Sequence, residues 1–105
     1  MKDTELKVQY INIKKLKPTE YNPRTWDEQA TVDLKESISR FGLVDPLLVN
    51  NAPGRENIVI GGHFRLKVAN DMGIDTVPVV YISINDPERE KELVIRLNKN
   101  LGAWD

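Results

Sequence analysis

The sequence predicts an α+β domain, a small mixed β-sheet with three helices packed against it. Short runs rich in Val, Ile and aromatic residues alternate with longer segments whose apolar residues recur every three or four positions. Glycine, proline and capping residues separate these segments. The predicted order is strand, helix, strand, strand, helix, strand, helix, without an internal repeat. At 105 residues the chain has room for one domain, which we expect to occupy residues 1–105.

The first half of the chain contains one predicted strand and one predicted helix. The run from Val8 to Ile13 is typical of a strand, and the basic segment "KKLKPTEYNPR" after it is expected to be a loop. Thr25 and Glu28 have capping-box spacing, which predicts a helix over Trp26–Phe41. Gly42 stands where a left-handed C-cap residue belongs. The apolar residues that share one helical face are Ala30, Leu34, Ile38 and Phe41.

The middle of the chain predicts two strands and a second helix. "DPLLVN" is a short buried strand, "NAPGREN" a turn, and "IVI" at Ile58–Ile60 the next strand. A helix closed by Gly73 follows directly. Its apolar face is formed by Phe64, Leu66, Val68, Ala69 and Met72.

The last third predicts a strand and a helix. Thr76–Ile82 is a strand in which Pro78 suggests an edge or strand-start position. Asp86 followed by Pro87 is a strong helix start, because Asp oxygens accept free N–H groups and proline lacks one to lose. We expect this helix to run to about Leu101, with a Glu92–Arg96 pair outside. The residues expected to face inward are Leu93, Val94, Leu97 and Leu101.

Composition excludes several classes of function. The chain has no cysteine, so it has no disulfide, thiol nucleophile or thiolate metal site, and a single histidine excludes a multi-histidine metal centre. We therefore predict no metal site. Net charge is −1 with a pI near 5.8, so any polyanion must be bound by a local patch. No apolar run approaches the roughly 20 residues of a membrane span, and no signal peptide is evident, so we expect a cytoplasmic location.

The stretch "IGGHFR" is the strongest candidate site. A strand that ends in Gly61-Gly62 and turns into a helix directs unpaired N–H groups and the positive helix end at whatever lies in front of the turn. Arg65 offers two N–H donors to a phosphate, and His63 is a further donor whose charge is expected to respond to pH near neutrality. The alternative is that the glycines only permit a tight turn. The spacing matches neither the dinucleotide fingerprint nor the P-loop.

Weaker candidates lie elsewhere in the chain. The basic segment offers phosphate contacts through Lys14, Lys15, Lys17 and Arg24, although such runs are usually solvated. Tyr21 and Trp26 are able to stack on a base, or they fix the helix start to the core. Glu36 is a solitary carboxylate on the first helix and a candidate catalytic residue only if an acid/base partner exists.

Four blocks in order, "PTEYNPR", "LKESISRFGLVDPLLVN", "IVIGGHFRLKVANDMGIDTVPVV" and "LNKNLGAWD", resemble the ParB N-terminal-like domain, which shares its fold with sulfiredoxin. The resemblance covers about Ile11 to Asp105. It implies a nucleotide- or nucleic-acid-associated domain in which three blocks converge on a phosphate-binding cleft. The ending is most similar to phage and mobile-element modules that precede a DNA methyltransferase.

The family's Gly-Glu-Arg-Arg-x-Arg box falls on residues 62–67 of this chain. Gly62 and Arg65 survive, and the last arginine becomes Lys67. The acidic residue is replaced by His63 and the first arginine by Phe64. Sulfiredoxin acts through a cysteine in this turn, so the resemblance does not extend to that activity.

Two further family blocks are partly kept. The Gly-Leu-x-x-Pro block survives as Gly42, Leu43 and Pro46. In partition proteins the last block reads Glu-Asn followed by an arginine; of this block only Asn98 remains, and the missing carboxylate argues against CTP hydrolysis of the partition type. No helix-turn-helix reader follows, so we do not expect sequence-specific DNA readout by this chain alone.

Two functional hypotheses remain. The first is a binding module for the phosphates of CTP, ATP or DNA that regulates or positions a DNA-acting partner, with homodimerisation through an edge strand as a further expectation. Its expected phosphate-binding residues are Gly61, Gly62, His63, Arg65, Lys67, Arg24, Gly42 and Asn98. The second is a phosphoryl-transfer or nuclease enzyme with Mg²⁺ held by Glu36 or Asp45.

Overall fold

The computed structural model describes residues 5–19 and 26–99 of the chain. It contains a five-stranded mixed sheet in the order β1-β5-β3-β4-β2. The strands are β1 (Val8–Asn12), β2 (Lys17–Pro18), β3 (Leu47–Asn50), β4 (Ile58–Gly61) and β5 (Thr76–Ile82). The helices of the described part are α1 (Glu28–Phe41), α2 (His63–Asp71) and α3 (Pro87–Lys99), with a 3₁₀ turn at Ile13–Lys15. The predicted α+β class is confirmed.

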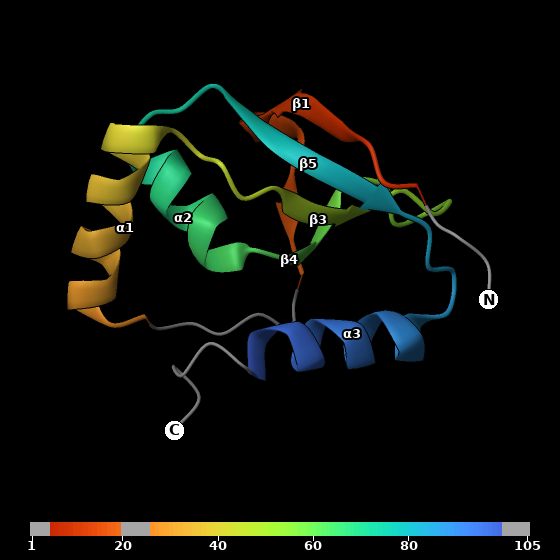
Figure 1. Cartoon of the computed structure of the whole chain (residues 1–105). Helices are drawn as coiled ribbons and strands as arrows, with labels where there is room; N and C mark the ends of the chain where they lie inside the picture. The colour runs from red at the N-terminus through yellow and green to blue at the C-terminus, as the bar shows by residue number, and fades with distance from the viewer. Residues whose placement is uncertain (1–4, 20–25, 100–105) are drawn as a thin grey trace.

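The helices flank the sheet in two groups. In Figure 1, α1 and α2 lie beside each other at one end of the sheet, whereas α3 runs beneath it, against β4. Antiparallel pairs join β1 to β5 and β3 to β4, and parallel pairs join β5 to β3 and β4 to β2. In the chain, α2 lies between β4 and β5, so both of its ends are joined to strands of the sheet. These connections fix the position of the turn between β4 and α2.

The core lies between the sheet and α2. Its central residues have essentially no exposed surface, as expected for apolar side chains packed at the density of a protein interior. They are Leu47, Val49, Val59, Ala69, Val77 and Val79. Ile13 and Leu16, from the segment after β1, complete this cluster. No helix among the described residues is both long enough and apolar enough to span a bilayer.

The start of α1 differs from the prediction. The helix begins at Glu28, and its N-cap is Asp27, whose Oδ1 accepts a hydrogen bond from the Gln29 N–H at 3.3 Å. Thr25, the predicted cap, lies outside the described residues. Asp and Thr are both good N-caps, so the sequence offered two competing starts two residues apart. At the other end Gly42 has the expected positive φ of 79°, but its ψ of 177° is extended rather than left-handed helical.

The segment predicted to be a loop contains regular structure. Ile13–Lys15 forms a 3₁₀ turn, and Lys17–Pro18 forms β2, which pairs in parallel with β4. A two-residue strand has no recognisable periodicity, and parallel pairing depends on a distant partner, so the sequence carried no signal for it.

Pro78 does not mark an edge strand, since β5 lies between β1 and β3. Ile13 N–H bonds to Asp75 O at 2.8 Å, so odd-numbered residues of β5 face β1 and the nitrogen of Pro78 faces β3. Pairing with β3 begins only at Val79, opposite Leu47. The missing proline N–H therefore removes no hydrogen bond from the ladder.

The predicted start of α3 is confirmed. Asp86 Oδ1 accepts a hydrogen bond from the Glu88 N–H at 3.0 Å, and Glu92 pairs with Arg96 at 2.9 Å. Val94 is fully buried as expected. Leu97 was expected to face inward but is 39% exposed, because only part of its side chain packs on β4. Leu101 lies outside the described residues.

Candidate functional site

The candidate site is the turn between β4 and α2. Gly61 ends β4, and Gly62 is the N-cap of α2 with φ 94° and ψ 24°, a left-handed conformation that favours glycine. A Cβ on Gly62 would lie 2.6 Å from Leu47 Cδ2 and 2.8 Å from Arg65 Nη2. Gly62 is thus required by conformation and by space.

No side chain of residues 5–19 or 26–99 caps the start of α2. The first N–H groups of a helix have no partner within the helix, and together they attract anions. A glycine N-cap has no side chain that could accept from these donors. The turn therefore has the local geometry that the sequence predicted for a phosphate site.

Gly61 has a different role from Gly62. It is extended, and a Cβ there would lie 3.0 Å from Leu97 Cδ1 and 3.5 Å from Leu48 Cβ. The absence of a side chain lets α3 approach the end of β4. The close approach of α3 to the β4–α2 turn depends on this glycine.

His63 is not the residue with a pH-responsive charge near neutrality that the sequence suggested. It is 3% exposed, and its Nε2 accepts a hydrogen bond from the Thr19 N–H at 3.2 Å. Burial lowers the pKa of His63 to about 4, although the Val59 backbone raises it slightly. The imidazole is therefore neutral near pH 7 and holds the chain after β2 against α2. Its Nδ1 has no partner of good hydrogen-bond geometry.

Arg65 connects the turn to the loop before β3. Its Nη2 donates to Pro46 O at 3.0 Å, and its Nη1 lies 3.5 Å from Asp45 Oδ2. The guanidinium also lies over Gly62, as the Cβ distance shows. Nε is buried without a partner. Two of the family blocks, the glycine turn and the Gly-Leu-x-x-Pro loop, thus converge as the resemblance implied.

The remaining predicted residues are placed less favourably. Lys67 is exposed and pairs with Asp71 at 2.9 Å. Gly42 lies at the end of α1 and lines a groove beside β1. Asn98 is on α3, and Arg24 lies outside the described residues. Among the described residues, no contact connects Lys67 or Gly42 to the guanidinium of Arg65.

Glu36 is not part of an acidic site in the described structure. It pairs with Arg40 at 2.8 Å on the surface of α1, where both side chains are more than half exposed. The described residues contain no group of three His, Cys, Asp or Glu side chains arranged to hold a metal ion.

Sequence reasoning missed two pockets. One, of about 470 Å³, lies beside α2 and is lined by Lys14, Trp26, His63 and Lys67 among others. Trp26 stacks on Phe64 with ring centroids 5.6 Å apart, so it fixes the start of α1 to α2, which agrees with the packing alternative for this residue. Lys14, after β1, and Lys67, on α2, line the same pocket although they are 53 positions apart in the chain, and no local sequence pattern indicates such a distant approach.

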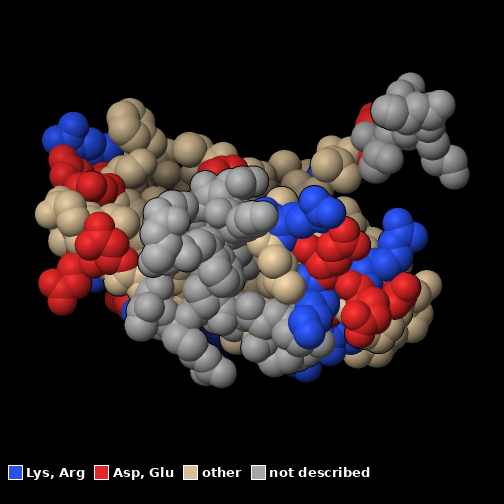
Figure 2. Space-filling view, turned by 90° about the horizontal axis from the view of Figure 1, so that it is seen from below, with Lys and Arg blue, Asp and Glu red and all other residues tan. Residues whose placement is uncertain are grey.

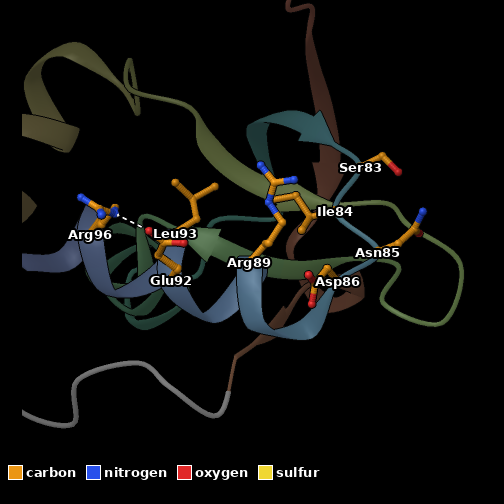
Figure 3. Close-up of a pocket in the computed structure, with 8 residues that line it drawn as sticks. All are labelled: Ser83, Ile84, Asn85, Asp86, Arg89, Glu92, Leu93 and Arg96. Carbon is orange, nitrogen blue, oxygen red and sulfur yellow. Dashed lines mark hydrogen bonds and ion pairs between the residues drawn. The ribbon is translucent and has the colours of Figure 1, made fainter.

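The second pocket, of about 570 Å³, lies where β5 passes into α3. In Figure 3, Arg89 extends from α3 beside Ile84, and Arg96 is drawn toward Glu92. Asp86 and Glu92 share the lining with these two arginines. The pocket is balanced in charge, so it is a weaker anion site than the turn before α2.

The described fold and turn define a class of protein, the ParB- and sulfiredoxin-like domains. Sulfiredoxin from Arabidopsis thaliana has the same fold, with a TM-score of 0.70 at 17% identity over 82% of this chain and 97% of its own. The family model of the ParB N-terminal domain matches residues 1–101. The chain belongs to the ParB N-terminal domain family.

Relatives within this family differ in length. The chain is 31% identical to the ParB-like nuclease domain-containing protein YnaK of Escherichia coli (strain K12), over 83% of this chain and 97% of YnaK. It is 34% identical to stage 0 sporulation protein J of Bacillus subtilis (strain 168), over 79% of this chain but only 29% of that protein. The chain therefore corresponds to one domain of that relative.

A solved structure of a partition protein is also similar. The C-terminally truncated chromosome-partitioning protein ParB of Caulobacter crescentus, complexed with CTP-γ-S, matches with a TM-score of 0.74 at 26% identity. The match covers 94% of this chain and 55% of that one. These findings give the chain a ParB-like, DNA-associated family context.

Proposed function

We propose that this chain is a phosphate-binding module that holds a nucleoside triphosphate at the turn before α2 and thereby regulates or positions a DNA-acting partner. The observation that carries the proposal is the combination of an uncapped helix start at Gly62 with a guanidinium fixed over it. Backbone N–H groups and a positioned arginine are the donors that phosphate oxygens require.

Arg65 is prepared for such a ligand. Its bond to Pro46 O fixes the guanidinium, so less side-chain entropy is lost on binding. The Asp45 carboxylate that accompanies it is 71% exposed and 3.5 Å away, so a phosphate is able to displace it at small cost. The neutral His63 contributes its backbone N–H and fixes the turn rather than supplying a charge.

CTP is the favoured nucleotide, because the similar Caulobacter ParB was solved with CTP-γ-S. Another solved form of that ParB is complexed to the centromeric parS site, at 27% identity to this chain, which supports a partner that acts on DNA. A DNA methyltransferase domain is one such partner, on the resemblance of the C-terminal block. ATP is the second proposed nucleotide ligand. We propose that Mg²⁺ accompanies either nucleotide and is bound through its phosphates.

Direct binding of long duplex DNA is less well supported than a compact nucleotide. In Figure 2, positive and negative side chains intermix over the face that carries α3. Duplex binding depends on many phosphate contacts from a basic surface. On the described part of this face, the charges do not form such a surface.

An enzymatic alternative is favoured by the name of YnaK, which refers to a nuclease domain. The described carboxylates do not cluster around the turn. Metal-dependent turnover of CTP, or cleavage of DNA, by the purified chain would establish this alternative. Equal turnover after Glu36→Gln would remove Glu36 from the candidate catalytic residues.

The test of the proposal is nucleotide binding with and without Arg65. We expect CTP with Mg²⁺ to raise the thermal midpoint of the chain, because a ligand at a hundredfold excess over its Kd adds about 2.7 kcal/mol of stability. ATP, GTP, ADP and short duplex DNA are the comparison ligands, each with and without Mg²⁺. Calorimetric titration then gives the Kd.

Arg65→Ala should abolish the shift while lowering the midpoint of the free protein only slightly, since one lost hydrogen bond costs about 1 kcal/mol. Arg96→Ala, which removes an exposed arginine of an i,i+4 pair, is the matched control and should bind normally. If neither nucleotide nor DNA shifts the wild-type chain, the proposal is wrong and the glycines serve turn geometry alone.

A further inference from the structure

The two edges of the sheet are protected to different degrees. Exposed edges invite pairing with another chain, and natural proteins protect them with short strands, lysine, proline or bulges. β2, at one edge, has only two residues, a lysine and a proline. β1, at the other edge, has five residues, "VQYIN", without charge or proline, and pairs with β5 in unbroken register.

The outward hydrogen-bonding groups of β1 follow from its register. Ile13 N–H bonds to Asp75 O, so odd-numbered residues of this segment face β5. Val8, Tyr10 and Asn12 therefore direct their N–H and C=O groups away from the sheet. Among the described residues, no strand pairs with this side of β1.

An apolar groove lies beside this edge. It has a volume of about 780 Å³, lies between β1, the end of α1 and the loop before β3, and has no charged residue in its lining. Four of its lining side chains are more than half exposed: Val8 at 52%, Tyr10 at 69%, Phe41 at 70% and Val44 at 75%. In a chain with 30% charged residues, such a concentration of exposed apolar side chains marks an interaction surface.

We infer that β1 pairs with β1 of a second copy of this chain, antiparallel and across a twofold axis at Tyr10. This register places Tyr10 opposite Tyr10 of the second copy, and Val8 opposite Asn12. Every outward N–H and C=O of these residues then finds a partner. The second copy's strand is itself uncharged, which suits the uncharged groove.

Side chains complete the contact. Residues 8, 10 and 12 of both copies lie on the same face of the joined sheet, because side chains alternate along a strand. The tyrosines therefore pack side by side at the junction, with Phe41 and Val44 of each copy beside them. Aromatic cross-strand pairs of this kind stabilise sheets by up to about 1 kcal/mol.

The available area fits a weak dimer. Tyr10 and Phe41 together expose on the order of 300 Å² per copy. The strand backbone and the two valines bring the contact toward the ~800 Å² per partner of a standard interface. Association should therefore depend on concentration.

Sedimentation velocity of the purified chain over a wide concentration range tests the inference. We expect a species of twice the 12.0 kDa chain mass at high concentration. Amide exchange measured over the same range should slow at Val8, Tyr10 and Asn12 as the dimer forms. Exchange at the β1 amides that bond to β5 should change less.

Tyr10→Lys places a charge on the edge and should yield a folded monomer, since the side chain is mostly exposed. Val44→Lys, outside the strand, should weaken the dimer independently. Val32→Lys is the matched control, because Val32 is 56% exposed on α1 and does not line the groove. A chain that stays monomeric at all concentrations, or a dimer that survives Tyr10→Lys, would overturn the inference.

Discussion

Two buried polar clusters, one formed around residues that precede β4 and one at the turn that follows it, differ in how completely their atoms are paired. In the first, Glu90 of α3 is 1% exposed and bonds to Arg55 at 2.5 Å and to Asn50 Nδ2 at 2.6 Å. Asn50 also accepts from Ala52 N and exchanges two hydrogen bonds with the Ile84 backbone. All the side-chain groups of Asn50 and Glu90 have partners within the protein.

The second cluster, Gly62, His63 and Arg65, is incompletely paired. Among the described residues, Arg65 Nε is buried without a hydrogen-bond partner, and His63 Nδ1 lies by the Val59 backbone without good hydrogen-bond geometry. No described side chain caps the helix start at Gly62. Buried polar groups are normally paired, so unpaired donors that gather at one turn indicate capacity for a ligand, whereas a closed network indicates an anchor. The first cluster fastens α3, and the second is where we propose that the phosphate ligand binds.

The largest expected effect follows from opening the closed cluster. Glu90→Ala removes the buried carboxylate to which both Asn50 and Arg55 donate, and we expect it to lower the free energy of unfolding by about 4 kcal/mol. Denaturant unfolding measures this loss. Glu92→Ala, two residues further along α3 in an exposed pair, should cost less than about 1 kcal/mol. Equal losses would show that the cluster is not an anchor.

A second effect concerns pH and sharpens the contrast between the two clusters. Because the pKa of His63 falls from 6.5 to about 4 on folding, the unfolded chain takes up a proton below pH 6.5 that the folded chain does not. Stability should therefore fall between pH 6.5 and 4, by about 3 kcal/mol in all. His63→Gln, which keeps an acceptor for Thr19, should flatten the unfolding profile over this range. Parallel profiles for the two proteins would contradict the assignment.

Glu90 responds in a lower range. Burial disfavours its charge, but hydrogen bonds from Arg55 and Asn50 and the Arg55 charge outweigh burial, so the pKa of Glu90 lies below its usual value. Its contribution is complete above the unfolded pKa and is lost as pH falls through the lower folded pKa. The difference between wild type and His63→Gln removes this shared background.

The smallest expected effect compares two costs of replacing a glycine: the strain of a positive φ and the steric clash of an added Cβ. Gly62→Ala adds a Cβ 2.6 Å from Leu47 to a residue with φ 94° and should cost about 2 kcal/mol. Gly54→Ala has a similar φ of 83° but open space around it, so it should cost only about 1 kcal/mol. Thermal unfolding of both variants compares them. An equal cost would mean that the turn is not tightly packed.

The sequence by itself determined most helices and strands, and it indicated the turn at Gly62, His63 and Arg65 but not the cluster around Glu90. Periodicity and caps located α3 at Asp86-Pro87 and β5 over Thr76–Ile82, because these signals lie within a few residues of one another. The glycine turn was visible for the same reason. Local chemistry is sufficient where an element is long or its end is marked by a specific residue.

Only the tertiary structure decided the features that depend on distant partners. The strand β2 forms because β4 lies beside it. Pro78 is tolerated within β5 because the pairing of β5 with β3 begins only at the next residue, Val79. His63 lost its expected charge because Thr19 and the core enclose it. The anchor at Glu90 joins residues 35 and 40 positions apart, and no local pattern carries such pairing. Burial and hydrogen bonding are properties of the folded chain. The sequence therefore determines which side chains are present, and the tertiary structure decides their charge and their partners.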